Sequence, residues 1–484
     1  MNLIDFLRKN VENRGDKVAI IDNSDEITFR ELYKKVEKFS NNIEELDQEG
    51  IVSLVSENSI SFIIAYLGLI HSGKIVHLIS SEISKTNLFN QLKSSKSKNI
   101  ICSQLIKNKI LNFHSIKITI LDIQEILLKN NNIKNNNIKN RTSSNKFAYL
   151  IYTSGTTSEP KGVIVSHSMI EFTTKNIVNV LGYSDLDIDL LPLPLNHSFG
   201  LGCLHTSLYV GSTLVLLKNA SNLEEIIESL KKYKITTLAA IPATLTKILN
   251  FENKKIEDYF SKIRLIITNS TAIPKKTVIQ FKEILKKGNL ATYYGLTEAS
   301  RSTFMVFDKN NHREESVGKC SPNVEIKIVN KEKNNLKFGD IYIKGENVIK
   351  KYWNNVEANK NIFENWLKTG DTGYFDEEGY LFLNGRSDEI INVGGEKVTP
   401  NEIEQTIKNI PGIEDVVAFG IKHEIFGQTI KLNVIKSKNS DIDKAKILSY
   451  CIKNLEKFKI PSKIDFVENI PKTDYGKVKR FMLK

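Results

Sequence analysis

Cysteine is scarce in this chain of 484 residues, and its four cysteines lie far apart: Cys102, Cys203, Cys320 and Cys451. No two of them form a C-x-x-C pair, so the sequence predicts neither a zinc site nor a disulfide framework. Long apolar runs are also missing. The longest, Ile60–Ile70, is too short to span a bilayer, and the amino terminus lacks the apolar core of a signal peptide. These absences predict a cytoplasmic protein without a membrane span.

Arginine is rare too, since the formal charge of +12 is carried by 59 lysines against nine arginines. The lysines are scattered, and no basic stripe alternates with aromatic side chains that could stack on bases. Nucleic-acid binding is therefore not predicted. The length allows roughly three domain-sized units with a large buried core. A polar near-repeat between Lys129 and Asn140 predicts a mobile surface loop.

The most informative segment is Tyr152–Val163, which follows a short apolar run from Phe147 to Ile151. We expect a strand that opens into a turn rich in hydroxyls and glycine. Backbone N–H groups and hydroxyls in such a turn can surround a polyphosphate. The turn is not a Walker A loop, because Lys161 is preceded by proline and followed by glycine. On composition alone, a polar surface turn is an equal reading.

This segment resembles, nearly residue for residue, the phosphate loop of the adenylate-forming superfamily. That superfamily includes acyl-CoA synthetases, aryl and aminoacyl adenylation domains, and luciferases. One departure is Ser158, where the family more often has glycine. The resemblance assigns the phosphates of ATP to Thr153, Ser154, Gly155, Thr156, Thr157 and Lys161.

Two more motifs follow in the family's order, Thr292–Glu298 and Lys368–Gly373. By resemblance Thr297 meets the α-phosphate and Glu298 holds Mg²⁺, which prefers carboxylate and phosphate oxygens. A carboxylate between glycines can accept hydrogen bonds from both ribose hydroxyls. The resemblance assigns adenine and ribose to Ser270, Thr271, Tyr293, Tyr294, Asp371 and Arg386. The turn that carries Ser270 and Thr271 is usually richer in glycine.

A histidine lies in the segment that lines the acyl pocket of similar enzymes. The resemblance assigns this pocket to His197, Phe199, Gly200 and Leu201, and counts His197 among the catalytic residues. Amino-acid-activating members usually place an aspartate here to hold the substrate ammonium. A histidine replaces that buried charge pair poorly, so we expect a carboxylic acid without an α-ammonium group.

The resemblance also divides the chain. It implies an AMP-binding and acyl-binding domain at 1–384, a hinge at 385–388 and a small lid domain at 389–484. Asp388 is the expected hinge residue, and Gly394 and Gly395 are expected to face the thiol channel. The tail Pro471–Arg480 matches the family's terminal catalytic loop, with Lys477 in the reactive position.

The expected fold is therefore α/β. A large lobe of layered βαβ sheets with a small β-barrel-like part precedes a small mobile α/β lobe. The expected activity is ATP-dependent activation of a carboxylic acid, followed by transfer to a pantetheine thiol, with CoA as the acceptor. An acyl carrier protein is the alternative acceptor, and a non-catalytic nucleotide-binding relative or a luciferase-like oxygenase are further alternatives. We expect a monomer or homodimer, and the sequence leaves the acid open.

Overall fold

The structure is a computed structural model that describes residues 1–23, 25–44, 46, 50–110, 118–129, 146–153, 160–218, 222–251, 256–309, 312–330, 338–394, 396–473 and 477–483. Several predicted features lie outside the described residues: the polar tract at 130–140, Ser154, Gly155, Thr156, Thr157 and Gly395. The described chain forms two compact units. One contains Met1–Glu325 and Lys344–Leu367, and the other contains Ile326–Ile343 and Lys368–Lys484. The expected hinge at 385–388 stays a prediction.

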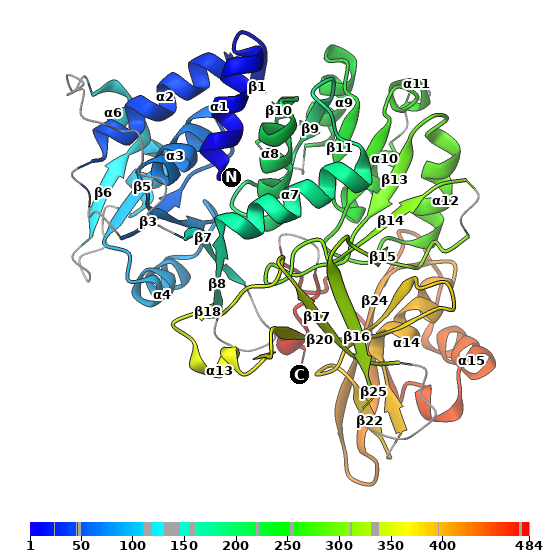
Figure 1. Cartoon of the computed structure of the whole chain (residues 1–484). Helices are drawn as coiled ribbons and strands as arrows, with labels where there is room; N and C mark the ends of the chain where they lie inside the picture. Colours follow the sequence, from blue (N-terminus) through cyan, green and yellow to red (C-terminus); the bar gives the residue numbers. More distant parts are fainter. Residues whose placement is uncertain are drawn as a thin grey trace. The chain divides into compact units, whose positions relative to one another are not determined.

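The first unit is built on two sheets (Figure 1). The seven-stranded sheet has the order β18-β8-β7-β4-β3-β5-β6. Its strands are β3 (Ile51–Val55), β4 (Ile75–Ile79), β5 (Asn99–Cys102), β6 (Thr119–Asp122), β7 (Phe147–Thr153), β8 (Lys161–Ser166) and β18 (Tyr352–Trp353). β3 and β4 are buried at every residue, which explains their mostly apolar sequence. The polar exceptions, Ser53 and His77, are hydrogen-bonded to each other at 3.0 Å.

The nine-stranded sheet has the order β15-β14-β13-β12-β11-β9-β10-β1-β2. Its strands are β1 (Val18–Asp22), β2 (Asp25–Thr28), β9 (Ile188–Leu191), β10 (Thr213–Leu216), β11 (Thr237–Ala239), β12 (Leu265–Thr268), β13 (Asn289–Thr292), β14 (Thr303–Phe307) and β15 (Lys319–Cys320). The central strands are parallel, so their carboxyl ends meet at one edge of the sheet. The turns that follow β12 and β13 are therefore neighbours.

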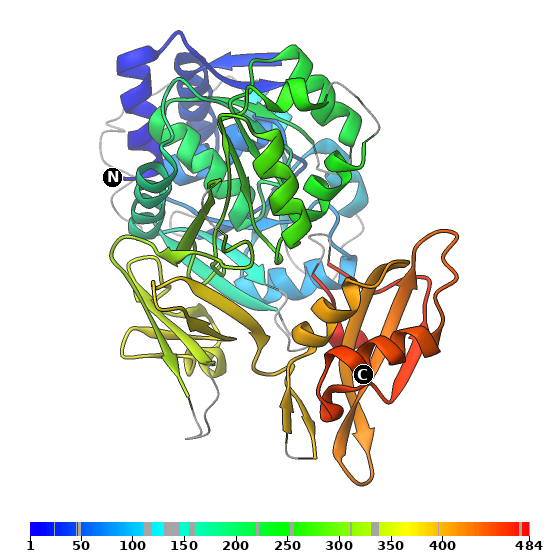
Figure 2. The same ribbon diagram turned by 90° about the vertical axis from the view of Figure 1, so that its right-hand side faces the viewer.

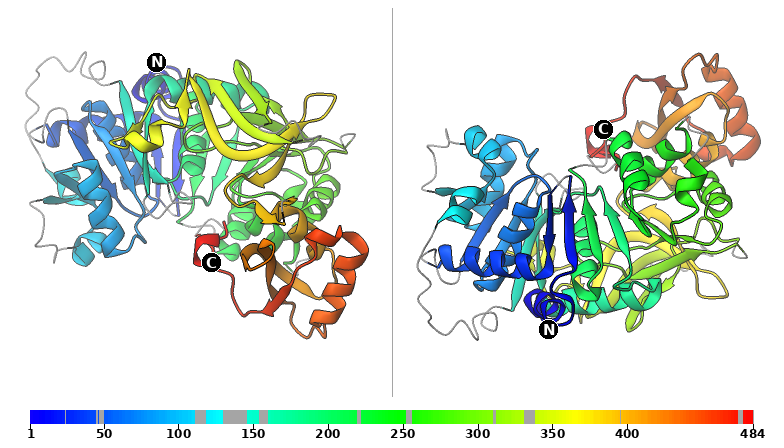
Figure 3. Two further views of the ribbon diagram at one scale, coloured as in Figure 1. Left: turned by 90° about the horizontal axis from the view of Figure 1, so that it is seen from below. Right: turned by 90° about the horizontal axis from the view of Figure 1, so that it is seen from above.

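Helices separate and flank the two sheets, as Figure 3 shows from two further directions. They are α1 (Leu3–Arg14), α2 (Phe29–Asn42), α3 (Ile60–His71), α4 (Lys85–Ser95), α5 (Gln104–Ile110), α6 (Ile123–Leu128), α7 (His167–Leu181), α8 (Ser198–Val210), α9 (Leu223–Lys232), α10 (Pro242–Leu249), α11 (Ile256–Phe260), α12 (Lys275–Ile284) and α13 (Val356–Asn359). One continuous core joins residues of α3, α7 and α8 to both sheets. A second core lies between β3–β5 and the helices α4 and α5.

The second unit holds most of one five-stranded sheet and the whole of another. The first consists of β16 (Val324–Val329), β17 (Gly339–Gly345), β19 (Ile362–Phe363), β20 (Trp366–Phe375) and β21 (Leu381–Arg386). The second consists of β22 (Ile391–Val393), β23 (Glu396–Val398), β24 (Ile413–His423), β25 (Gly427–Lys436) and β26 (Lys463–Phe466), with helices α14 (Pro400–Lys408) and α15 (Lys444–Asn454) and short 3₁₀ turns at Lys457–Lys459 and Arg480–Met482. Figure 2 shows α15 lying across the strands of this sheet.

Two strands that the sequence did not predict adjoin predicted turns. After the predicted strand, β7, the chain passes the predicted loop and returns as β8, so an antiparallel hairpin brackets the loop. A further short strand, β23, pairs with β22 and precedes α14. Among the described residues, no helix is both long and apolar enough to cross a bilayer.

Candidate functional site

The phosphate-loop hairpin is held at both ends of the loop. Thr153 and Lys161 are cross-strand partners, so the chain leaves and re-enters the sheet at one place. On its other side, β8 pairs with β18, where Trp353 lies opposite Gly162. A Cβ at Gly162 would lie 3.1 Å from Trp353, so the absence of a side chain permits close packing here. The hairpin therefore offers a fixed base for the predicted phosphate loop.

Thr297 and Glu298 occupy the tip of a tight turn after β13. Leu296 and Ala299 exchange backbone hydrogen bonds of 3.1 Å across this tip. Behind it, the carbonyl of Tyr294 accepts backbone hydrogen bonds from Ser302 and from Thr303, the first residue of β14. The turn is therefore tied down on both sides, and two neighbouring polar side chains project from it.

Glu298 is positioned by a residue that sequence reasoning missed. The hydroxyl of Tyr352 donates a hydrogen bond of 3.2 Å to Glu298 Oε1, and the amide of Ile349 donates one of 2.9 Å to the Glu298 carbonyl. Tyr352 belongs to β18, which also pairs with the phosphate-loop hairpin. No motif marks Tyr352, because its role depends on a contact across 54 residues.

The residues around Glu298 fit a magnesium ion that is held mainly by nucleotide. Within the described part of the chain, no group of three or more His, Cys, Asp or Glu side chains could hold a metal ion. Mg²⁺ usually keeps several waters and is bound by one or two carboxylates and substrate phosphates. A single half-buried carboxylate on a fixed turn meets that requirement.

The turn after β12 carries backbone strain. Ser270 has φ = +90°, a conformation that glycine adopts readily and serine does not. Its amide donates a hydrogen bond to the side chain of Asn269. Ser270 is half-buried and Thr271 is exposed. This positive φ explains why glycine would suit the turn, which is usually richer in glycine in similar enzymes.

The two tyrosines of the second motif are both buried, with 6% of each exposed. The ring of Tyr293 packs edge-on against Phe199, with centroids 5.5 Å apart. The guanidinium of Arg301 lies over the same ring, 4.7 Å from its centroid. Tyr293 is thus part of the interior, and the assignment of adenine to Tyr293 and Tyr294 stays a prediction.

The helix α8 presents other residues to a cavity than the ones predicted. Phe199 and Leu201 are buried in the core. A Cβ at Gly200 would lie 2.4 Å from the carbonyl oxygen of Pro194, so this glycine permits close backbone packing. The residues of α8 that line the cavity are Ser198, Gly202 and His205. The assignment of the acyl pocket to His197, Phe199, Gly200 and Leu201 stays a prediction.

Two histidines near this cavity are held neutral. Burial, with a further contribution from Arg301, lowers the pKa of His197 to about 4 and that of His205 to about 3. His205 also forms a hydrogen bond of 2.9 Å with the hydroxyl of Tyr66. Neither imidazole therefore carries a charge at neutral pH, so a negatively charged ligand would not be attracted by them.

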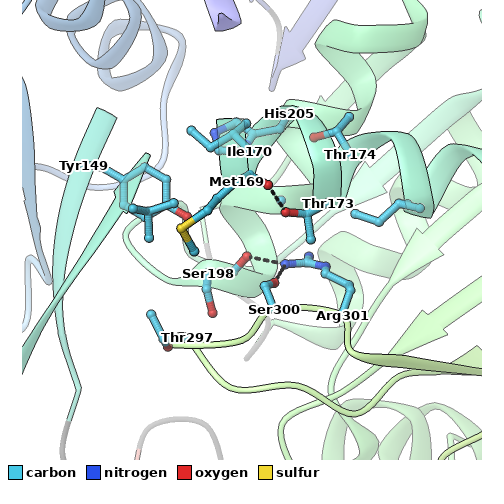
Figure 4. Close-up of a pocket in the computed structure, with 13 residues that line it drawn as sticks. Tyr149, Met169, Ile170, Thr173, Thr174, Ser198, His205, Thr297, Ser300 and Arg301 are labelled. Carbon is cyan, nitrogen blue, oxygen red and sulfur yellow. Dashed lines mark hydrogen bonds between the residues drawn. The ribbon is translucent and has the colours of Figure 1, made fainter. Parts of the chain in front are cut away.

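The cavity is narrow, with a volume of about 20 Å³. Its walls come from β7, β8, α7, α8 and the turn that contains Thr297 and Arg301 (Figure 4). The apolar wall consists of Tyr149, Val165, Met169, Ile170 and Ile177. The polar wall consists of Thr173, Thr174, Ser198, His205, Thr297, Ser300 and Arg301. Sequence reasoning singled out only Thr297 among these, since the periodic apolar residues of α7 are those of any amphipathic helix.

In the second unit, the residues assigned to the ribose lie together. Asp371 and Arg386 are cross-strand partners on β20 and β21, and Arg386 Nη1 lies 3.2 Å from Asp371 Oδ1. Arg386 Nε lies 3.2 Å from Asp388 Oδ1, so one guanidinium joins Asp371, the carboxylate assigned to the ribose by sequence, to the expected hinge residue. Although burial alone would lower the pKa of Arg386, these two carboxylates raise it overall. A Cβ at Gly370 would meet this guanidinium.

The terminal loop has a defined anchor. Lys477 is exposed, its amide donates a hydrogen bond of 3.1 Å to Thr473 Oγ1, and its carbonyl accepts one of 2.7 Å from the Thr473 amide. Three residues later, Arg480 contacts Glu389 at 3.0 Å and Glu404 at 2.5 Å. Arg480 thus ties the loop to the segment after Asp388 and to α14.

The glycine turn between β22 and β23 is partly described. Gly394 is exposed and has φ = +61°, and its amide donates a hydrogen bond of 2.9 Å to the carbonyl of Phe426. A Cβ at Gly394 would approach the Phe426 ring to 3.2 Å. The role of Gly394 in a thiol channel stays a prediction.

The sequence model of the AMP-binding enzyme family matches residues 7–353, and that of the AMP-binding enzyme C-terminal domain matches residues 402–477. The chain belongs to the AMP-binding enzyme family. This AMP-binding enzyme is 31% identical to an oxalate–CoA ligase of Arabidopsis thaliana over 89% of the chain and 87% of that protein. It is 27% identical to a 2-succinylbenzoate–CoA ligase of Listeria innocua over 100% of the chain and 99% of that protein.

A solved structure of o-succinylbenzoate CoA synthetase from Bacillus subtilis superimposes on this AMP-binding enzyme with a TM-score of 0.88. The two share 24% identity over 99% of this chain and 97% of the other. This likeness confirms the predicted α/β fold, with a large amino-terminal domain built on sheets and a smaller carboxyl-terminal domain. The family-model matches and the relative at 31% identity, rather than this superposition, confirm the predicted membership of the adenylate-forming superfamily. The roles of individual residues stay predictions.

Proposed function

We propose that this AMP-binding enzyme is an acid–CoA ligase that uses Mg-ATP. A substrate carboxylate attacks the α-phosphorus of ATP, pyrophosphate leaves, and an acyl-adenylate forms. The CoA thiol then attacks the acyl carbon, and AMP leaves with the bridging oxygen. The observation that carries this proposal is the match to both domains of one family in a single chain, supported by relatives that are named CoA ligases.

In the first step, the chain positions the nucleotide and the acid. We assign the triphosphate to the loop bracketed by Thr153 and Lys161, and the ribose to Asp371 and Arg386. Thr297 supplies a hydroxyl for the α-phosphate. Glu298, fixed by the hydroxyl of Tyr352, would hold the magnesium ion. When bound, that ion neutralises charge on the phosphates and on departing pyrophosphate.

Lys477 supplies a second positive charge in the same step. Its proposed partners are the attacking carboxylate and the α-phosphate, between which negative charge accumulates. A unit charge ~4 Å away at an effective dielectric constant of ~20 contributes about 4 kcal/mol. That is roughly three orders of magnitude in rate. A lid that moves at Asp388 would bring Lys477 in for the first step and withdraw it for the second.

The proposal also covers the thiol acceptor, the cellular location and the oligomeric state. CoA is the proposed acceptor because the relatives above are named for it. A carrier-protein phosphopantetheine is the alternative, which an assay with CoA and with a holo-carrier protein separates. We propose a cytoplasmic monomer or homodimer. A long-chain fatty acid–CoA ligase of Haemophilus influenzae, 26% identical, is also a relative, so the names alone do not choose between monoacids and diacids.

The experiment is acid-dependent exchange of labelled pyrophosphate into ATP, followed by thioester formation with CoA. We expect at least one acid from a panel of short monoacids, diacids, aryl acids and long-chain acids to support both reactions. Glycine and alanine serve as the amino-acid controls and should not support exchange. A folded protein that shows no exchange with any acid would contradict the proposal and favour the non-catalytic alternative.

A further inference from the structure

Arg301 is a buried cation in the wall of the cavity described above. Only 4% of the residue is exposed. Taking an ion out of water costs several kcal/mol, and the fold recovers this cost only if the charge meets good partners. The hydrogen-bond acceptors and counter-charges around the Arg301 guanidinium therefore indicate which kind of ligand could bind there.

Among the described residues, all hydrogen-bond partners of the Arg301 side chain are neutral oxygens. Nη1 donates to the carbonyl of Ser198 at 3.0 Å and to Ser300 Oγ at 2.8 Å, and Nη2 donates to the carbonyl of Phe199 at 3.2 Å. The guanidinium also lies over the Tyr293 ring. Nε is buried and has no hydrogen-bond acceptor among the described residues. No carboxylate of the described chain pairs with Arg301.

Other arginines of this chain form ion pairs with carboxylates. Six of them pair with an aspartate or glutamate: Arg8, Arg14, Arg30, Arg264, Arg386 and Arg480. Arg264 shows the usual solution, because it holds both oxygens of Asp187 at 2.7 and 2.5 Å. A guanidinium is shaped for such a two-point contact, with Nε–H and one Nη–H parallel. In Arg301, the Nε–H half of that fork is without an acceptor.

Arg301 lines the same cavity as the residue that we assign to the reacting end of the substrate. Thr297, which we assign to the α-phosphate, lines the same cavity four residues earlier in the same turn. Figure 4 shows the Arg301 side chain reaching toward Ser198 and Ser300 on the polar side, while Met169 and Tyr149 lie on the apolar side. A volume of about 20 Å³ admits a group about the size of one water molecule. A long apolar chain does not fit.

We propose that Arg301 binds a second carboxylate of the substrate, so that the preferred acids are short dicarboxylic acids. The inference rests on the acid-activating function proposed above. One carboxylate reacts near Thr297, and the other accepts hydrogen bonds from Nε–H and an Nη–H of Arg301. The atoms that link the two carboxylates lie outside this cavity, because its volume of about 20 Å³ has room for one such group alone. A monoacid of equal length leaves the buried guanidinium without an anion.

The competing explanation is structural. Arg301 joins the turn to the start of α8, and it could do no more than that. A structural role predicts that removing Arg301 lowers stability and slows monoacids and diacids alike. A binding role predicts that the ratio between the two substrate classes changes.

The experiment measures kcat/KM for acid-dependent pyrophosphate exchange with three matched pairs: butyrate and succinate, valerate and glutarate, hexanoate and adipate. For the unaltered protein, we expect a preference of at least about tenfold for the diacid in one pair or more. In Arg301→Met, the diacid of that pair should lose about 100-fold. The monoacid should change by less than about threefold. Arg301→Lys should recover part of the diacid rate.

The control is Arg30→Met, the same change at an exposed, paired arginine, and it should leave the ratio of diacid to monoacid kcat/KM unaltered.

The outcomes separate this inference from the proposed function. Exchange with monoacids and a diacid preference below about tenfold in every pair would overturn the inference while leaving the function intact. Equal losses for both classes in folded Arg301→Met would also overturn it. Absence of exchange with any acid would overturn both proposals. If Arg301→Met does not fold, the preference of the unaltered protein decides the question.

Discussion

Two arginines in two regions of this chain, Arg301 buried and Arg480 half-buried, are stabilised in opposite ways. In the carboxyl-terminal unit, Arg480 lies between Glu389 and Glu404, and Glu404 also accepts a hydrogen bond of 2.8 Å from the Ala418 amide. Among the described residues of the amino-terminal unit, the Arg301 guanidinium meets neutral oxygens and an aromatic ring. Arg480 has its counter-charges within the fold. For Arg301, the counter-charge proposed above is a carboxylate of the substrate.

The difference separates basic residues that hold the structure together from those available to a ligand. Arg386 belongs with Arg480, because it already contacts Asp371 and Asp388. Lys477 belongs with Arg301, because no ion pair to it is found among the described residues and its side chain is exposed. Residues of the first kind should control stability when they are replaced, and those of the second kind should control rate and substrate choice.

The largest effect should follow replacement of Lys477. Lys477→Ala should slow adenylation about a thousandfold, because a charge worth about 4 kcal/mol is removed from the transition state. Thioester formation from supplied acyl-adenylate should change by less than about threefold. Lys472→Ala, in the same segment but paired with Asp415, is the control and should leave adenylation nearly unchanged. If both half-reactions fell equally in Lys477→Ala, the assigned role would be wrong.

Arg480→Met should destabilise the carboxyl-terminal unit by about 3 kcal/mol, because two largely buried carboxylates lose their counter-charge. Hydrogen exchange of the β24 amides measures this local stability. Arg301→Met removes bonds to neutral oxygens and should weaken protection in α8 by only about 1–2 kcal/mol. If Arg301→Met reduced the protection of α8 more than Arg480→Met reduces that of β24, the contrast between the two arginines would be contradicted. Lys446→Met, in an exposed pair, serves as the control.

Tyr352→Phe should raise the magnesium concentration needed for half-maximal exchange about tenfold. The variant removes one hydrogen bond to a carboxylate, a contact typically worth about 1.5 kcal/mol or more. Glu298→Gln should shift the magnesium requirement further than Tyr352→Phe does. An unaltered magnesium requirement in both variants would exclude Glu298 as the metal ligand.

Stability should fall in acid because buried histidines are held neutral. Burial lowers the pKa of His71 to about 4, and neither ring nitrogen has a hydrogen-bond partner among the described residues. The unfolded chain binds more protons than the folded chain between about pH 6.5 and 4, so the stabilisation is present above this range and is lost as pH falls through it. His71→Leu should therefore reduce the loss of stability between about pH 7 and 5 by about 1–2 kcal/mol, measured by urea unfolding.

Asp189 provides a check on the sign of this effect. Burial raises the pKa of this carboxyl to about 6, so the folded state binds more protons than the unfolded state above the ordinary carboxyl range. Its contribution therefore weakens as pH rises toward 6, opposite to the histidine effect. Asp189→Asn should steepen the loss of stability in acid. A shallower acid loss in Asp189→Asn would contradict the assignment.

The smallest effect concerns the strained turn after β12. Ser270→Gly should raise the free energy of unfolding by about 0.5–1 kcal/mol, because glycine adopts a positive φ without the cost that serine bears. Ser270→Ala keeps the strain and should give no gain. Equal stability of the two variants would show that the positive φ is not costly in this chain.

Local chemistry made part of this molecule predictable from sequence. Thr28 and Glu31 form a capping box on α2, and Ser166 caps α7. Both caps join residues three positions apart, so the sequence alone carries this pattern. The mostly apolar sequences of β3 and β4 are likewise typical of strands buried on both faces. Motif order along the chain then predicted the family, which the comparison confirmed.

The remaining features depend on contacts that no local pattern records. Tyr352 meets Glu298 only because β18 joins the edge of a sheet that begins much earlier in the chain. No motif marks Arg301, whose contacts with α8 and Tyr293 exist only in the folded chain. The sequence likewise did not predict which residues of α7 line the cavity. Helical apolar spacing predicts that a residue is buried, but not that it faces a cavity.

The most direct test of the account follows an oxygen atom. The protein is given ATP, CoA and an acid that supports exchange, with both carboxylate oxygens replaced by oxygen-18. If an acyl-adenylate forms and the thiol attacks its acyl carbon, one heavy oxygen must appear in AMP and the other in the thioester. Release of ADP and phosphate, or thioester formation with unlabelled AMP, would contradict the account.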